Sequence, residues 1–152
     1  PGTFGPNEAG NPRDHTLLIE ANMQGLFMRI VKGEIPAHKV MENDLVLAFL
    51  DIFPLVPGHT LVIPKVEVDS IYDLDEAHYQ ALWEMTRNIA PAIKKAFPCL
   101  KVGIAVIGLE VPHAHVHLVP LQNVADLNFA RPKLKPDQAE LEKNAELIRS
   151  LL

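Results

Sequence analysis

The chain has 152 residues, enough for one domain that buries roughly 70% of the surface of its unfolded chain. Its 48% hydrophobic and 22% charged residues are typical of a globular protein, and no apolar run is long enough to span a membrane. The formal net charge of −5 excludes a broad basic surface for nucleic acid, and the single cysteine excludes a disulfide framework and favours a reducing cytoplasm.

The first segment, residues 1–25, contains Gly, Pro and Asn without periodicity, and we expect it to be a leader outside the folded domain. A short helix is predicted over 26–32, because Gly33 and Pro36 are typical of the residues that follow a helix.

Three strands are predicted next. Residues 38–42 and 45–52 flank the turn-forming pair Asn43-Asp44, which indicates a hairpin. A third strand is expected over 59–64, after a segment broken by prolines and a glycine.

The longest helix is predicted over 75–97, where apolar residues recur with a period of 3.6, and Pro91 should kink or split it. Two more strands follow, 101–107 and 111–119, and a last helix begins near Asp137. This order predicts an α+β fold with a mainly antiparallel sheet packed on one long helix, plus short helices near both ends.

The most informative segment carries His113, His115 and His117 in strict alternation with apolar residues. On a strand these side chains share one face at a spacing of about 7 Å. Each buried imidazole needs hydrogen-bond partners and titrates near neutral pH, so packing alone is a poor explanation for three in a row. The row fits either a nucleophile oriented by its neighbours or a zinc site, and spacing does not separate the two.

Three segments in the same order resemble the histidine triad (HIT) superfamily. Residues 113–119, His-Ala-His-Val-His-Leu-Val, resemble its His-x-His-x-His-x-x signature, where x is apolar. Residues 48–65 resemble its Asp-x-x-Pro…His-x-Leu-Val-Ile-Pro-Lys segment, and residues 26–36 resemble its opening helix. The resemblance implies a HIT domain over 26–120, followed by an extension over 121–152 to which the sequence assigns no role.

The resemblance also implies roles for single residues. His115 would be the nucleophile that forms a nucleotidyl-histidine, His117 and His59 would donate to α-phosphate oxygens, and His113 would orient the row. Asp51 would accept hydrogen bonds from ribose hydroxyls, as a carboxylate can. The base pocket would be lined by Phe27, Ile30, Phe49 and Ile52. Without the resemblance, these apolar residues could equally form core, and Asp51 and His59 could be turn and strand-capping residues.

Residues 101–110 depart from the family pattern, which usually has an Asn and a Gly-Gln pair shortly before the triad. Here there is no Asn, Leu109 replaces the Gln, and Glu110 stands where some relatives have Ser or Thr. The backbone N–H of Glu110 can still bind substrate, whereas its carboxylate disfavours a nearby phosphate. Met28 and Glu67 occupy positions that hold zinc ligands in some relatives, so we predict no metal and no cofactor.

We therefore expect a hydrolase or nucleotidyl transferase acting at the α-phosphate of a purine nucleoside phosphoramidate or a dinucleoside polyphosphate. One alternative is a nucleotide-binding regulator with little or no catalysis, and another is a metal-dependent enzyme built on the same row. The resemblance implies a homodimer that shares a continuous sheet, and neither nucleic acid nor a membrane is expected as a partner.

Overall fold

The computed structural model describes residues 25–152, so the predicted leader, apart from Gly25, lies outside the described residues. The predicted α+β class is confirmed. The strands are β1 (Lys39–Glu42), β2 (Val46–Leu50), β3 (Thr60–Pro64), β4 (Lys101–Ala105) and β5 (Val116–Leu121). The α-helices are α2 (Leu26–Val31), α3 (Glu76–Ala96) and α4 (Gln138–Ser150), and two 3₁₀ helices are η1 (Ile71–Asp73) and η2 (Val124–Leu127).

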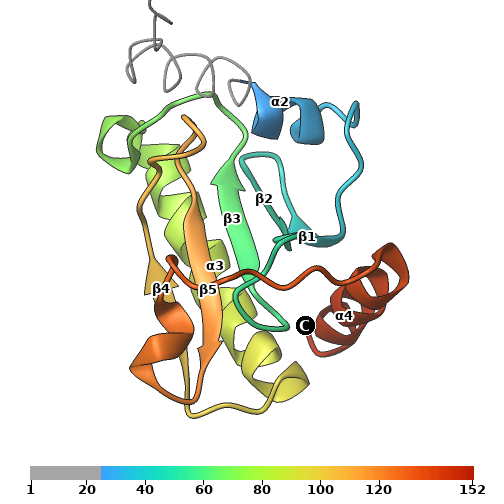
Figure 1. The fold of residues 1–152 in the computed structure, drawn as a ribbon. Helices are drawn as coiled ribbons and strands as arrows, with labels where there is room; N and C mark the ends of the chain where they lie inside the picture. The colour runs from blue at the N-terminus through green and yellow to red at the C-terminus, as the bar shows by residue number, and fades with distance from the viewer. Residues whose placement is uncertain (1–24) are drawn as a thin grey trace, which may run out of the picture.

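The five strands form one sheet in the order β1-β2-β3-β5-β4, and every neighbouring pair is antiparallel. The long helix α3 lies across one face, α4 lies beside the β1 edge, and α2 lies near the ends of β2 and β3 (Figure 1). The central strands β2 and β3 are buried at every position, as expected for strands that are covered on both faces.

Alternation along the strands divides the core into two clusters. Val46, Ala48 and Leu50 of β2 pack with buried residues of α3 and α4. Leu47 and Phe49 point to the opposite face and pack with Phe27 and Ile30 of α2 and with two apolar residues of β3. The α2 face of the sheet therefore carries apolar side chains from three elements, and the candidate site lies on this face.

The helix predictions agree with the structure, except that of the two outcomes expected at Pro91, a kink or a split, the split does not occur. Asp75 accepts a hydrogen bond from the backbone N–H of His78 and begins α3, and Asp137 begins α4 in the same way. The helix α3 continues through Pro91 and is not split. Ile89 and Ile93, on either side of the proline, are fully buried, and this packing maintains the helix although one backbone donor is missing.

The predicted strand bounds need three corrections. The strand expected over 45–52 ends at Leu50, and the one expected over 101–107 ends at Ala105. The strand expected over 111–119 begins only at Val116 and continues to Leu121. Pro64, at the end of β3, has no N–H for a ladder, and the backbone N–H of Ala114 donates to the carbonyl of Val68 instead, so pairing starts later.

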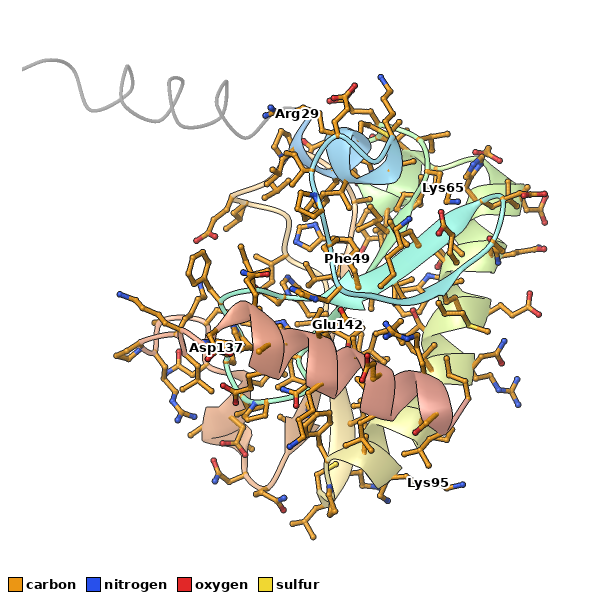
Figure 2. All side chains as sticks on the ribbon, turned by 90° about the vertical axis from the view of Figure 1, so that its right-hand side faces the viewer. Arg29, Phe49, Lys65, Lys95, Asp137 and Glu142 are labelled. Carbon is orange, nitrogen blue, oxygen red and sulfur yellow. The ribbon has the colours of Figure 1, made fainter. Side chains whose placement is uncertain are left out.

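The helix α4 packs into the core formed with α3 and the sheet, through Leu141, Ala145 and Ile148. Figure 2 shows α4 running across the front of the molecule from Asp137 past Glu142. Within residues 25–152, no helix is long and apolar enough to cross a membrane.

Candidate active site

The three histidines of the row are buried side by side, although only His117 belongs to β5. The strand register pairs His117 with Leu61, so its side chain points to the α2 face. His115 lies next to it, with ring centroids 4.8 Å apart. The ring of Phe27 stands edge-on against His113 at 5.5 Å and against His115 at 5.2 Å.

The hydrogen bond of His115 fixes which ring nitrogen carries the proton. Its Nδ1 lies 2.6 Å from the carbonyl oxygen of His113, and because a carbonyl only accepts, Nδ1 is the donor. In the neutral ring, Nε2 then carries a lone pair. Burial lowers the pKa of His115, while the hydrogen bond to His113 and the negative charges of Glu110 and Asp69 raise it in part. A neutral imidazole with a free Nε2 is the form that acts as a nucleophile.

The hydrogen bonds of His59 and His117 also fix which nitrogen of each ring carries the proton. The backbone N–H of Leu55 donates to Nδ1 of His59 at 3.1 Å, so the proton of neutral His59 lies on Nε2. That Nε2 lies 2.9 Å from Nδ1 of His117 and donates to it. Nε2 of neutral His117 consequently carries a proton. Burial lowers the pKa of each of these two histidines to about 3, which keeps both rings neutral near pH 7.

His113 is fixed to the end of β3. Its Nε2 donates to the carbonyl oxygen of Pro64 at 2.8 Å, and its buried Nδ1 has no hydrogen-bond partner in the described structure. Burial lowers the pKa of His113. Its carbonyl oxygen holds His115, so the main chain of His113 orients the central ring.

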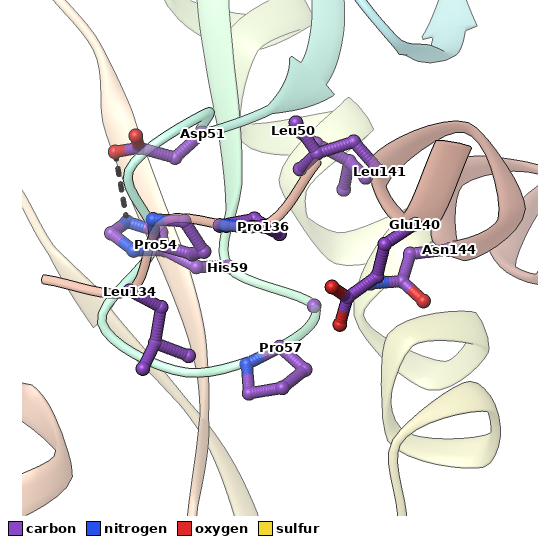
Figure 3. A pocket seen from close by; sticks show the side chains of 11 residues that line it. Leu50, Asp51, Pro54, Pro57, His59, Leu134, Pro136, Glu140, Leu141 and Asn144 are labelled. Carbon is purple, nitrogen blue, oxygen red and sulfur yellow. Dashed lines mark ion pairs between the residues drawn. The ribbon is translucent and has the colours of Figure 1, made fainter. Parts of the chain in front are cut away.

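Asp51 lies just beyond β2, where its side chain helps to turn the chain. Its Oδ1 accepts a hydrogen bond from the backbone N–H of Phe53 at 2.9 Å, and this Asx-type turn ends the strand earlier than expected. Its Oδ2 lies 3.7 Å from Nε2 of His59 (dashed line in Figure 3). Burial raises the pKa of Asp51, and the charge of Lys133 opposes that shift.

A cavity of about 470 Å³ opens beside the histidine row, large enough for a nucleotide-sized ligand. Eight of the ten sequence-predicted site residues line it: Phe27, Ile30, Phe49, Asp51, Ile52, Glu110, His115 and His117. The other two, His59 and His113, lie next to lining residues and hold them in place.

Two residues of the cavity wall lie beyond the predicted HIT domain of residues 26–120, and nothing in the sequence indicated that they belong to the site. Phe129 and Lys133 come from the segment between η2 and α4, beyond the predicted domain. The ring of Phe129 packs against His117 with centroids 4.7 Å apart. No periodicity or motif surrounds either residue in the sequence. They reach the site because the tertiary fold places the segment after η2 beside the cavity.

Asp51, His59 and His117 also form a group whose potential ligand atoms lie within 4.8 Å of one another. Such a set of one oxygen and two nitrogen ligands suits zinc. However, Nδ1 of His59 already accepts from Leu55, and Nε2 of His59 donates to His117, so the ring atoms satisfy each other without an ion. The arrangement fits a hydrogen-bonded pair better than a metal centre.

Comparison with known proteins identifies the family. Residues 32–124 match the model of the HIT domain. The chain is 39% identical over 130 residues to an uncharacterized HIT-like protein of Borreliella burgdorferi, covering 80% of this chain and 91% of that protein. It is 34% identical over 102 residues to an adenosine 5'-monophosphoramidase of Schizosaccharomyces pombe, covering 66% of this chain and 77% of the relative.

Among solved structures, a Hit-like protein from Bartonella henselae, described as involved in cell-cycle regulation, superimposes with a TM-score of 0.72 at 33% identity. The match covers 84% of this chain and 95% of that one. The fold and the buried histidine row thus define a histidine triad domain, and the chain belongs to the HIT family.

Proposed function

We propose that this chain is a nucleotide hydrolase or nucleotidyl transferase that cleaves at the α-phosphate of a purine nucleoside phosphoramidate or dinucleoside polyphosphate. The observation that carries the proposal is the lone pair on Nε2 of His115, beside the cavity and next to a protonated Nε2 on His117. The phosphoramidase activity of the Schizosaccharomyces pombe relative supports the choice of reaction.

In the first step, the lone pair of His115 Nε2 forms a bond to the α-phosphorus. The bond from phosphorus to the leaving amine or phosphate breaks, and the leaving group takes its electron pair and, for an amine, a proton from solvent, which the second step returns. His117 Nε2 donates a hydrogen bond to a non-bridging phosphate oxygen and balances the charge that develops there.

In the second step, water attacks the phosphorus of the nucleotidyl-histidine. The nitrogen–phosphorus bond breaks, its electron pair returns to Nε2 of His115, and the proton of the water passes to solvent. A nucleoside monophosphate is released, and two easier steps replace one difficult step. In a transferase, another nucleophile takes the place of water.

The remaining cavity residues suit a nucleoside. Oδ1 of Asp51 is occupied by the Phe53 N–H, so Oδ2 is the oxygen that would accept from a ribose hydroxyl. Phe27, Ile30 and Phe49 form a buried apolar wall that would hold the base. Ile52 is 46% exposed at the cavity rim and would become covered when a base is bound.

Intact-protein mass spectrometry tests the proposal. The protein is mixed with adenosine phosphoramidate and quenched within seconds in denaturant at alkaline pH, because acid hydrolyses a nucleotidyl-histidine. The parent is compared with His115→Ala and with the control His78→Ala, which lies at the start of α3 away from the cavity. We expect an adenylyl adduct on the parent and on the control but not on His115→Ala. Free nucleotide release is measured in parallel, because a fast second step leaves little adduct. Turnover that persists in His115→Ala would refute the mechanism.

A second candidate function is a nucleotide-binding regulator with little catalysis. It is favoured by the loop before the row, where Leu109 is 83% exposed and Glu110 brings a carboxylate to the cavity. Saturable binding of adenosine monophosphate without adduct or nucleotide release from any substrate would favour this function over the first.

We also propose that two copies associate through β4. Within residues 25–152, this strand lies at the edge of the sheet and pairs only with β5, so its outer backbone groups face no other described strand and can pair with a second copy. Leu100, Ile104 and Ile107, in or next to β4, are exposed apolar residues.

A further inference from the structure

The segment of residues 128–136, which we call the C-terminal strap, crosses from η2 to α4 beside the cavity. Its start is held by Asn128, whose side chain accepts from Ala130 N–H at 3.0 Å and whose carbonyl accepts from Arg131 N–H at 3.1 Å. Near its end, the backbone N–H of Leu134 donates to the carbonyl of Pro54 at 2.9 Å. Figure 3 shows Leu134 close to the loop that carries His59.

These anchors hold two strap side chains at the site. Phe129 is half-buried, with its ring against His117 and, at 6.1 Å, against His59. Lys133 is also half-buried and lines the same cavity. Burial is the largest cause of the raised pKa of Asp51 and of the lowered pKa values of His59 and His117. The positive charge of Lys133 acts on all three groups, opposing the first shift and adding to the other two.

Lys133 differs in charge from the other titratable residues of the cavity wall. Two carboxylates, Asp51 and Glu110, line it, and its two lining histidines have lowered pKa values. Among the described residues, Lys133 is the only lysine or arginine in the cavity wall, and it takes part in none of the ion pairs found there. A phosphate bound at the row would therefore be near two like charges and one opposite charge.

We propose that Lys133 binds a non-bridging oxygen of the α-phosphate, beside the Nε2 proton of His117. This inference rests on the proposed function, which brings a phosphate to the row. A neutral imidazole supplies a hydrogen bond but no charge, and the ammonium of Lys133 supplies the charge that offsets Asp51 and Glu110. The strap thus adds a phosphate-binding residue from outside the matched family segment of residues 32–124.

The test compares Lys133→Met and Lys133→Arg with Lys135→Met, a matched control on the exposed part of the same strap. Calorimetry gives the Kd for adenosine monophosphate and for adenosine, which lacks the phosphate. We expect Lys133→Met to weaken adenosine monophosphate binding by about 10- to 100-fold, the usual range for a hydrogen bond to a charged group. Adenosine binding should be unchanged, Lys133→Arg should recover part of the loss, and Lys135→Met should resemble the parent.

Equal weakening of both ligands would mean that Lys133 only supports the strap, and no weakening would mean that it does not reach the phosphate. Either result overturns the inference. In kinetics, kcat/KM should fall by a similar factor for adenosine phosphoramidate and diadenosine polyphosphate, which share the α-phosphate. A loss confined to the polyphosphate would assign Lys133 to the leaving group and also overturn it. The binding measurements need no turnover, so they decide the role of Lys133 even if the parent is not an enzyme.

Discussion

His59 and His117 are two buried histidines that remain neutral because burial lowers the pKa of each to about 3. In the unfolded chain, each would titrate near pH 6.5. Between these values the unfolded chain binds protons that the folded protein does not bind. The free energy of unfolding therefore decreases as the pH falls through this window.

We expect acidification from pH 7.5 to pH 5 to cost about 2 kcal/mol of folding free energy for each of these two histidines. Urea unfolding at both pH values measures the loss in the parent and in His117→Gln, which should lose about half of this pH dependence. Asn88→Gln, an exposed substitution on α3 that changes no titratable group, is the control and should retain the full dependence. An unchanged dependence in His117→Gln would contradict the assignment of neutral, desolvated rings.

At the scale of elements, the loop between β2 and β3 sets the position of His59. Gly58 adopts φ +90°, and a Cβ atom added there would lie 2.5 Å from the ring of Phe97. Gly33, after α2, has a similar φ of +78° but nothing within 4 Å of such an atom. Alanine substitutions at the two glycines therefore separate two free-energy costs, that of a left-handed backbone conformation and that of overlap with Phe97.

Gly33→Ala should destabilise the protein by about 1–2 kcal/mol, the cost of a left-handed conformation with a side chain. Gly58→Ala should cost about 1–3 kcal/mol more, because the new methyl group overlaps Phe97. It should also reduce nucleotide turnover, since the displaced loop carries His59. Thermal unfolding compares the two variants, and equal losses would show that the Phe97 contact is unimportant.

The local signals in the sequence were sufficient for most elements, because capping residues, turn pairs and periodicity act within a few residues. Asn43 accepts from the N–H groups of Leu45 and Val46, as the predicted turn requires. The start of β5 was missed because it depends on the partner strand. The alternation of histidines indicates an extended chain, but the pairing of β3 with β5 stops at Val62 and Val116.

At the scale of the whole molecule, the proposed association through β4 can be tested by a charge at the sheet edge. Ile104 is 47% exposed on β4, and Leu147 is 43% exposed on α4. We expect Ile104→Asp to reduce the mass in solution from twice 16.9 kDa to 16.9 kDa, because a buried unpaired carboxylate is costly at an interface. Leu147→Asp should leave the mass of the parent unchanged. Light scattering after gel filtration gives both masses, and a dimeric Ile104→Asp would argue against this interface.

In the candidate site, too, residues within local sequence motifs were predicted, and residues placed by contacts distant in the sequence were not. The residues nominated from sequence lie in motifs between residues 27 and 117, and all ten lie in or directly beside the cavity wall. Phe129 and Lys133 belong to a strap whose position depends on contacts with Pro54 and on the docking of α4. Such contacts have no signature within a single segment.

The hydrogen-bond chain from Leu55 through His59 to His117 has a direction, and that direction begins at a main-chain atom. An amide N–H can only donate, so it fixes the polarity of every link that follows it. The chain of hydrogen bonds places a hydrogen on Nε2 of His117, beside the electron pair that the His113 carbonyl leaves on Nε2 of His115. The cavity wall therefore presents a pair of groups that complements an electrophilic atom bonded to an electron-rich one. The side chain of residue 55 can vary without reversing this polarity, and only proline, which has no N–H, would remove its source.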